Sequence, residues 1–289
     1  MSKQSHISMY CDPELMQCRP DFNPFTYSAM LSDGYQGYDF LSVLYPAVKA
    51  AYPDLKVSCC DSTGARQQRD FLYELNRLGG GKYFDINTYH NYQSDIKEPF
   101  SDLLPYGQPT VETEWSDGGS TFVGTWDVQG QNFEGFQWAI YMHWAFVNNV
   151  AGWSHWWCTW TGGDAALINV NGTTQTYEVA SRLWAFSGYF RFARPGAVRL
   201  DATTNVPEVR LTAWKNTNGT ISIPVVNSAH YTYTASFDLS NVGAVNYATA
   251  YLTDNEHNVT DVGSFHFSGG QFTADVEPRS MKVFFLETK

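Results

Sequence analysis

The chain has 289 residues, which allows one large domain or one domain with a smaller companion. Aromatic residues make up 16% of the chain and charged residues also 16%, so there is ample apolar material for a core. The formal net charge of -11 argues against binding to nucleic acid or anionic membranes, because both attract basic surfaces.

Apolar periodicity predicts helices that alternate with strands up to residue 192, whereas residues 1–26 show no clear period. Helices are expected from Tyr35 to Pro53 and at 66–78, 133–150 and 177–190, and strands at 55–60, at 83–87, in the segment that ends at Trp115, and at 151–158. Such an alternation indicates a parallel sheet with crossover helices. We count four β/α units between residues 55 and 192.

The strand segment Val111–Trp115 contains two acids, Glu112 and Glu114. Alternate side chains of a strand lie on one face, so these acids are expected to point the same way, roughly 7 Å apart. Two interior acids are costly unless they are hydrogen-bonded, paired or used. Glu114 lies where the strand becomes a loop, and α/β barrels build their chemistry at that end of the strands. We therefore predict a catalytic role for Glu114 and a deeper, hydrogen-bonded position for Glu112.

The pattern changes after Arg194-Pro195-Gly196. Apolar residues alternate with polar ones in later segments such as 221–225 and 272–276, and turn sequences separate these segments. This pattern is typical of antiparallel strands with one face buried. We therefore predict an α/β domain at 1–195 and an antiparallel β-sandwich domain at 196–289.

The five cysteines are too few for a disulfide scaffold and fit no zinc spacing, although one or two disulfides are compatible with them. Cys59 and Cys60 are neighbours in an expected strand, so their side chains should face opposite sides and pack in the core. No metal constellation stands out, since His143 and His155 are isolated in the sequence. We expect no cofactor.

Signals for cellular location are sparse. The sequons at Asn171, Asn218 and Asn258 permit glycosylation outside the cytosol, although such tripeptides also arise by chance. No apolar run approaches the roughly 20 residues of a membrane span. Residues 1–6 contain no apolar segment of the signal-peptide type.

An ordered set of short stretches resembles a known family. The stretches are Tyr27-Ser28-Ala29-Met30, Leu44-Tyr45-Pro46, Cys59-Cys60-Asp61, His90-Asn91-Tyr92, Thr113-Glu114-Trp115 and Phe190-Arg191-Phe192-Ala193-Arg194-Pro195-Gly196. Together they resemble glycoside hydrolase family 30, and in particular its fungal endo-β-1,6-galactanase and xylanase-like branch. The resemblance runs from about residue 20 to the C-terminus.

The resemblance implies an eight-stranded β/α barrel fused to a side β-sandwich, and hydrolysis of β-glycosidic bonds with retention. It places Glu114 on the seventh barrel strand as the nucleophile. It places His90 and Tyr92 at the end of the sixth, where a tyrosine contacts the nucleophile. Trp156 or Trp157 ends the eighth strand and forms the floor of the sugar subsite. Members of the family are extracellular, and a complete one is expected to be a monomer that acts on a polysaccharide.

The second carboxylate of the family, the acid/base, lies in an Asn-Glu-Pro tripeptide that this sequence lacks. Retaining hydrolysis needs two carboxyl groups about 5–5.5 Å apart on opposite sides of the sugar, and neighbours on one strand such as Glu112 and Glu114 do not provide this. The nearest substitute is Glu14, in Asp12-Pro13-Glu14. We therefore expect a partial (β/α)8 barrel with strands five to eight, truncated at the N-terminus, and no measurable hydrolysis of glycosides by the chain as written.

Each candidate has an alternative role. Glu114 is equally compatible with an interior acid held by Arg or Tyr, and His90 with a capping or core histidine. Tyr92 fits a site better, because a phenol beside a carboxylate favours the ionised carboxylate. Asp61 follows a strand end, where it suits either substrate binding or a plain turn.

The aromatic candidates also divide between two roles. Trp115, Trp156 and Trp157 suit a carbohydrate cleft, because flat apolar sugar faces stack on aromatic rings. Most of the ten tryptophans nevertheless belong to the core, given their size. Three functions therefore stay open: a family 30 hydrolase, a module that holds glycans without cutting them, and a fragment of a complete enzyme.

Overall fold

The computed structural model describes residues 6–8, 32–116, 122–128, 130, 133–161, 166–242, 245–267 and 270–288. Internal contacts divide the chain into two compact units. The first contains Met1–Ser116 and Trp144–Trp156, and the second contains Asp117–His143 and Trp157–Lys289. The predicted domain boundary after residue 195 concerns independent folding and stays a prediction.

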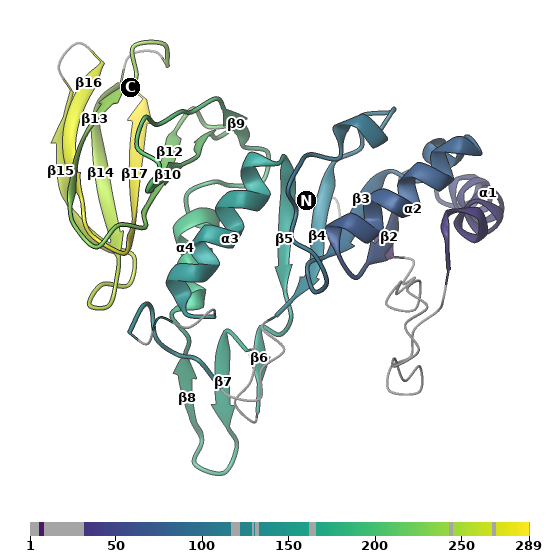
Figure 1. Cartoon of the computed structure of the whole chain (residues 1–289), viewed down its shortest axis with the longest axis horizontal. Coiled ribbons are helices and arrows are strands. Elements are labelled where there is room, and N and C mark those ends of the chain that lie inside the picture. Colours follow the sequence, from purple (N-terminus) through teal and green to yellow (C-terminus); the bar gives the residue numbers. More distant parts are fainter. Residues whose placement is uncertain are drawn as a thin grey trace. The chain divides into compact units, whose positions relative to one another are not determined.

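The first unit is built on one sheet with the strand order β1-β2-β3-β4-β5 (Figure 1). Its strands are β1 (His6–Ser8), β2 (Lys56–Ser62), β3 (Ile86–His90), β4 (Thr110–Trp115) and β5 (Val150–His155). Every pairing between them is parallel, which confirms the expected parallel sheet. β3 begins at Ile86 rather than at Tyr83, because the 3-10 turn η2 (Gly80–Lys82) and its cap occupy the residues before it.

Helix α1 (Gly34–Ala51) lies where the periodicity predicts it. A capping box starts it: the Asp33 carboxylate accepts a hydrogen bond from the Gln36 N–H (2.8 Å), and the Gln36 side chain accepts one from the Asp33 N–H (3.3 Å). Helix α2 (Ala65–Arg77) also matches its prediction, and it ends before Gly79. The φ of 74° at Gly79 favours glycine at that position.

The connection between β3 and β4 is a loop, as expected, since no helix is predicted between residues 87 and 111. It contains only the 3-10 turn η3 (Ser101–Leu103), so one of the four counted β/α units has no α-helix. Pro99 and Pro105 flank this turn. Proline lacks an N–H and fixes φ, so two prolines this close leave no room for a regular helix.

The Asp85 carboxylate ties together the amino ends of β2 and β3. It accepts hydrogen bonds from the Val57 N–H (2.9 Å) and the Tyr45 hydroxyl (3.2 Å), and it forms an ion pair with Lys49 (2.8 Å). The amino ends of the strands are therefore fixed by a structural cluster. The carboxyl ends, where parallel sheets carry their sites, stay available for chemistry.

Cys59 and Cys60 depart from the alternation expected of a strand. Both are fully buried in β2, and their sulfur atoms form a disulfide with each other. The two side chains therefore meet, instead of facing opposite sides of the sheet as predicted. Burial in the core is confirmed.

Helix α3 (Gly135–Val147) is shorter than the predicted helix at 133–150. It stops because Asn149 adopts a φ of 63°, a left-handed conformation that Asn tolerates, and β5 begins at the next residue. β5 in turn covers Val150–His155, slightly earlier than the predicted strand at 151–158.

The helix predicted at 177–190 is wrong in its first part. The chain forms a three-stranded sheet, β6 (Thr159–Trp160), β7 (Ile168–Asn171) and β8 (Thr176–Val179), before α4 (Arg182–Phe190). Asn171-Gly172 is a turn signal and Ile168 and Val170 alternate, which are both features of a hairpin.

The rest of the second unit is antiparallel and contains one seven-stranded and one two-stranded sheet (Figure 1). Its strands are β9 (Val198–Leu200), β10 (Val209–Leu211), β11 (Ala213–Lys215), β12 (Ile221–Asn227), β13 (Tyr233–Asp238), β14 (Val245–Thr253), β15 (Thr260–His266), β16 (Gln271–Val276) and β17 (Ser280–Thr288). Side chains from both sheets, including Ile223, Phe272 and Phe284, pack in one apolar core. This arrangement confirms the predicted antiparallel β region.

The expected burial of one face only does not hold for the central strands. Every residue of β12 is buried, because it pairs with neighbours on both sides and both faces of the sheet are covered. A Cβ on Gly188 of α4 would lie only 2.7 Å from the Met281 side chain, and Phe192 contacts Phe285 with ring centroids 5.5 Å apart. Helix α4 and the residues after it therefore cover the face opposite β13 and β16.

Within the described part of the chain, no helix combines the length and the apolar character needed to cross a membrane.

Candidate active site

The candidate site lies at the carboxyl ends of β3 and β4. His90 is the last residue of β3, and Glu114 is the next to last of β4. Tyr89 pairs with Glu112 and His90 pairs with Glu114, so Thr113 is an extra residue in the ladder. A bulge of this kind bends a strand and changes the direction of its side chains. It therefore breaks the strict alternation expected between Glu112 and Glu114.

The Glu114 carboxylate contacts two of the predicted site residues. The Tyr92 hydroxyl donates a hydrogen bond to its Oε1 (3.1 Å), and His90 Nε2 lies 3.9 Å from its Oε2. The Glu114 side chain is 19% exposed and the His90 side chain only 6%. Glu114, His90 and Tyr92 therefore form one cluster, and Glu114 is partly accessible to a ligand.

The protonation states in this cluster follow from burial. Burial lowers the pKa of His90 to about 4, so the imidazole is neutral near pH 7 and forms no ion pair with Glu114. Burial and the negative charge of Glu114 raise the pKa of Tyr92. The phenol therefore keeps its proton, which it donates to the carboxylate.

Glu112 is fully buried, as predicted, but its environment differs from the expected one. No donor in the described part of the chain forms a hydrogen bond with either carboxylate oxygen. Burial raises the pKa of Glu112 well above its ordinary value, and the nearby backbone N–H groups of Glu114 and Ser154 act in the opposite direction. The negative charges of Glu114 and Asp61 raise the pKa further. A proton on Glu112 is the arrangement that this environment favours.

Asp61 supports the bulge in β4. It is buried, its φ is 57°, and its carboxylate accepts a hydrogen bond of 2.6 Å from the Thr113 hydroxyl. Asp61 therefore contacts the residue that separates Glu112 from Glu114. The sequence analysis named Asp61 but missed Thr113, because a bulge depends on the strands on either side and has no signal of its own in β4.

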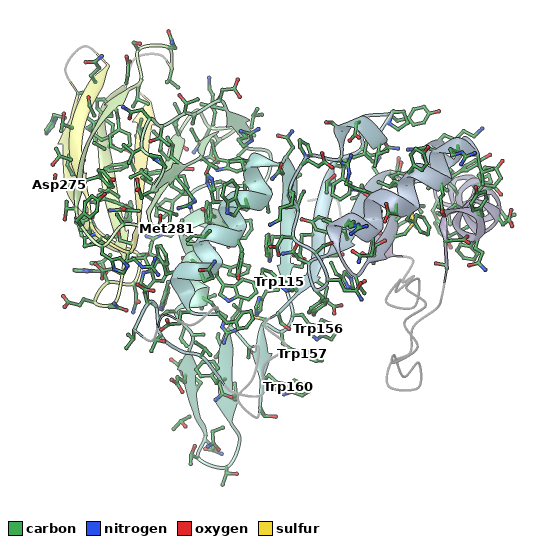
Figure 2. All side chains as sticks on the ribbon, in the orientation of Figure 1. Trp115, Trp156, Trp157, Trp160, Asp275 and Met281 are labelled. Carbon is green, nitrogen blue, oxygen red and sulfur yellow. A yellow bond between two sulfur atoms is a disulfide. The ribbon has the colours of Figure 1, made fainter. Side chains whose placement is uncertain are left out.

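Two of the predicted tryptophans lie in the first unit (Figure 2). Trp115 is only 6% exposed and packs against Trp153, with ring centroids 5.8 Å apart. The backbone N–H of Trp156 donates a hydrogen bond to the Trp115 backbone carbonyl (3.0 Å), and Trp156 is 39% exposed. Trp156 therefore offers accessible ring area, whereas Trp115 mainly supports the end of the sheet.

Trp157 belongs to the second unit, where it stacks on Trp160 with ring centroids 4.4 Å apart and planes 22° apart (Figure 2). Trp160 is 42% exposed. The sequence analysis did not select Trp160, although its spacing from Trp157 was visible. The roles of both residues in substrate binding stay predictions.

Two further expectations concern other residues. Glu14, the candidate acid/base, lies outside the described residues. In the part of the chain that is described, no group of three or more His, Cys, Asp or Glu side chains is placed to hold a metal ion.

The fold is similar to that of glycoside hydrolase family 30 catalytic domains. The catalytic domain of GH30 xylanase C from Talaromyces cellulolyticus matches 93% of this chain with 27% identity and a TM-score of 0.81. The family 30 subfamily 8 xylanase Xyn30A from Clostridium acetobutylicum matches 97% with 20% identity and a TM-score of 0.74. An endo-β1,6-glucanase matches 90% with 16% identity and a TM-score of 0.63.

The chain spans 60%, 66% and 55% of the lengths of these three solved structures, in the same order. No family model matches the sequence.

Proposed function

We propose that this chain carries the nucleophile half of a retaining glycoside hydrolase that acts on β-linked polysaccharide. The observation that supports this most directly is the position of Glu114, a partly accessible carboxylate at the carboxyl end of a parallel strand. A neutral tyrosine donates a hydrogen bond to it, and a neutral histidine lies beside it. The similarity to family 30 xylanases and to an endo-β1,6-glucanase supports the same reaction class.

In the proposed reaction, the Glu114 carboxylate attacks the anomeric carbon, the bond from this carbon to the leaving-group oxygen breaks, and a covalent glycosyl-enzyme forms, which water then hydrolyses. Tyr92 holds the carboxylate in place and keeps it ionised through its hydrogen bond. His90 is neutral, so it does not neutralise the negative charge of the Glu114 carboxylate that attacks the sugar. Trp156 offers an accessible ring on which a sugar can stack.

The acid/base is the second requirement of this chemistry. The sequence contains no Asn-Glu-Pro tripeptide, and the proposal assigns no described residue to this role. A missing general acid typically slows a reaction by about 10²–10⁴-fold. The loss depends on the leaving group, because an acidic aryl alcohol departs without a proton whereas a sugar hydroxyl does not.

This dependence gives the test. We expect the chain to react with dinitrophenyl β-glycosides, whose leaving group needs no acid, and to release little or no product from polysaccharide. Mass spectrometry should detect the glycosyl group on the peptide that contains Glu114. Azide should accelerate turnover of the aryl glycoside, since an anionic nucleophile needs no general base. Failure of every aryl glycoside to label the chain would contradict the proposal.

The substrate is a narrower proposal. The sequence resemblance favours β-1,6-galactan, whereas the solved structures that the chain resembles include xylanases and an endo-β1,6-glucanase. Labelling with galactosyl, xylosyl and glucosyl versions of the same aryl glycoside separates these three. Faster labelling by the galactosyl compound would support the galactanase branch.

A glycan-binding module without catalysis is the alternative, and the lack of an assigned acid/base favours it. Such a module would retain polysaccharide but would never form the covalent adduct. The proposed setting is extracellular, with the complete protein acting as a monomer. The sequon residues Asn171, Asn218 and Asn258 are all exposed, as glycosylation outside the cytosol requires.

A further inference from the structure

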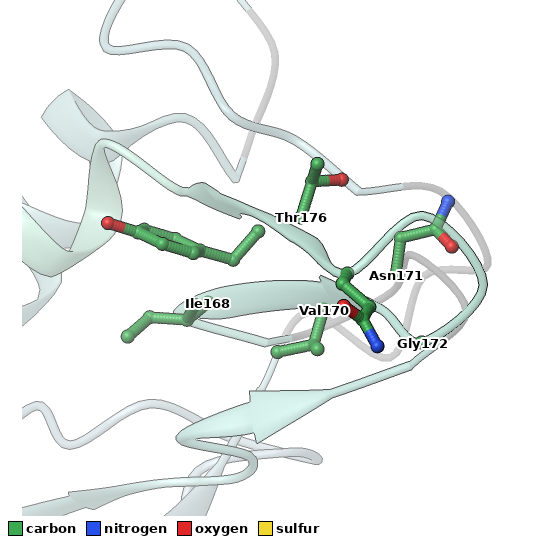
Figure 3. Close-up of a pocket in the computed structure, with 7 residues that line it drawn as sticks. Ile168, Val170, Asn171, Gly172 and Thr176 are labelled. Carbon is green, nitrogen blue, oxygen red and sulfur yellow. The ribbon is translucent and has the colours of Figure 1, made fainter.

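A second feature with the character of a binding site lies on the β7–β8 hairpin (Figure 3). It is an open pocket of about 520 Å³. Small-molecule sites typically occupy about 300–1,000 Å³, so its size suits a short oligomeric ligand. None of the residues that line it belongs to the cluster around Glu114.

The floor of the pocket is apolar because of the strand register. Val170 pairs with Tyr177 across the hairpin, and Ile168 pairs with Val179. Directly paired and alternate residues share a face of the sheet, so Ile168, Val170 and Tyr177 lie on the same side. Figure 3 shows Ile168 and Val170 next to each other in the pocket. Tyr177 is 73% exposed, which leaves its ring available as a flat platform.

Neutral polar groups accompany this floor. Gln175 also lines the pocket and brings an amide to it. Asn171 pairs with Thr176, so the side chains of both lie on the face opposite Val170 and Tyr177. The Asn171 side-chain oxygen already accepts hydrogen bonds from the N–H groups of Thr173 (3.0 Å) and Thr174 (3.1 Å). The Asn171 side chain therefore stabilises the turn, and the Gln175 amide is the polar group of the lining that can meet the hydroxyl or ring oxygens of a ligand.

The residues that line the pocket carry no charge. Residues 166–177 contain no Asp, Glu, Lys or Arg, in a chain that carries 29 acidic and 18 basic residues. An anionic ligand would find no cation here and would meet the overall net charge of -11. A cationic ligand would find no carboxylate in the lining, because Glu178 pairs with Asn169 and lies on the face opposite Tyr177. The lining therefore complements an uncharged molecule that has one apolar face and many hydroxyl groups.

We propose that the β7–β8 hairpin binds a neutral glycan chain, with a sugar ring stacked on Tyr177 and against Val170. The choice of a glycan rests on the proposed function, since a hydrolase of polysaccharide meets this class of ligand. The hairpin site retains the polymer without taking part in its cleavage. Sugars present axial C–H groups on one face and hydroxyls at the edge, which matches the apolar floor and the Gln175 amide.

The test uses native gel electrophoresis of the full chain in gels that contain soluble polysaccharide. The chain is produced in a host that does not glycosylate Asn171. The probes are uronic-acid-free β-1,4-xylan and β-1,6-galactan as neutral polymers and polygalacturonate as an acidic one. We expect at least one neutral polymer to retard the chain, polygalacturonate not to, and Tyr177→Ala to weaken the retardation about tenfold. Tyr106→Ala, at a tyrosine that is 66% exposed outside the pocket, serves as the matched control and should behave like the wild type.

The Glu114→Gln variant separates this proposal from the proposed function. We expect it to lose covalent labelling and to keep the Tyr177-dependent retardation. Three results would overturn the hairpin site: no retardation by any neutral polymer, equal retardation of wild type and Tyr177→Ala, or equal retardation by polygalacturonate. Sedimentation that shows a dimer abolished by Tyr177→Ala would overturn it too, because the occupant would then be a second copy.

Discussion

One buried polar side chain from each unit shows two opposite arrangements. In the second unit, Asn227 is fully buried, and its amide donates to the carbonyls of Tyr231, Val276 and Glu277, each at 3.0 Å, while its oxygen accepts from the Ala229 N–H (2.9 Å). In the first unit, Glu112 is equally buried, and neither of its oxygens has a hydrogen-bond partner among the described residues.

Other side chains in each unit follow the same division. Lys282 is buried and donates to the Asp275 carbonyl (2.8 Å) and to Glu277 (2.7 Å). His90 Nε2, in the candidate site, and the Tyr89 hydroxyl, on a ring that packs against Phe100 in the core, are buried and have no hydrogen-bond partner in the described part of the chain. Buried polar groups without partners are costly, so they mark positions kept for a purpose other than stability. The second unit is not free of such atoms, since Ser222 Oγ is also buried without a partner among the described residues, and the first unit satisfies the buried side chains of Gln68 and Asn87. The contrast therefore concerns Glu112 and His90 at the carboxyl edge of the parallel sheet, compared with Asn227 and Lys282.

The sharpest test of this comparison is Glu114→Gln. The swap is nearly isosteric but removes the charge that attacks the anomeric carbon. We expect labelling by dinitrophenyl glycosides to fall on the order of 10³-fold or more, with thermal unfolding unchanged. Glu256→Gln, at an exposed acid of the second unit, should label like the wild type. If Glu112→Gln lost labelling and Glu114→Gln kept it, the nucleophile would be Glu112.

The second test asks whether the antiparallel unit is held together by its own strands. Residues 197–289 contain β9 to β17 but lack α4 and Phe192, which cover Met281 and Phe285. We expect this segment alone to show no cooperative thermal transition, because an apolar face of its larger sheet becomes exposed. The longer segment 180–289, which keeps α4, should show one. A cooperative transition of 197–289 alone would support the domain boundary at residue 195 instead.

The third test addresses the buried polar side chains of the second unit that have hydrogen-bond partners. Asn227→Ala leaves three carbonyls and one N–H without their side-chain partner, so we expect a loss of about 3–5 kcal/mol in the free energy of unfolding. Asn218→Ala, at an exposed asparagine in the turn between β11 and β12, should cost less than about 1 kcal/mol. Chemical denaturation of both variants measures the difference. Equal losses would mean that the Asn227 network does not stabilise the fold.

Much of the fold and of the candidate site can be predicted from the sequence, because these features depend on local patterns. Helices α1 and α2 follow apolar spacing, and Glu114 follows an apolar strand and precedes a loop. The bulge at Thr113 was not predictable in this way, because it arises from the pairing of β4 with β3 and β5. The proximity of Tyr92 to Glu114 was expected only from the family resemblance.

The errors have a common physical origin. Residues 177–179 were assigned to a helix because Val179 fits the apolar stripe of α4, but pairing with β7 places them in a strand. The burial of both faces of β12 could not be read from β12, because its cover comes from helix α4 and from neighbouring strands. Local periodicity reports which face of an element is apolar, and it does not report what lies against the other face.

The smallest expected effect concerns how much the buried Glu112 carboxyl group lowers the stability of the folded chain. Its folded-state pKa is raised well above the ordinary value of 4.5, so the folded chain holds a proton that the unfolded chain releases. The carboxyl group is protonated in both states below about pH 4.5, and its contribution to stability is then fully present. As the pH rises from there through the folded-state pKa, that contribution is lost.

Glu112→Gln cannot titrate, so it should be nearly as stable as the wild type at pH 4.5 and more stable at pH 7.5, by about 1–3 kcal/mol. Denaturation of both proteins at a series of pH values measures the difference, and effects of other titrating groups cancel. A Gln variant that is less stable at every pH would show that a donor reaches the carboxylate. If Glu112→Gln were more stable than the wild type by the same amount at every pH, the shape of the Glu112 side chain, rather than its charge, would cause the difference. In the first case Glu112 would be a satisfied polar group like Asn227, and in the second its charge would cost nothing. Either result would remove the clearest example of the contrast.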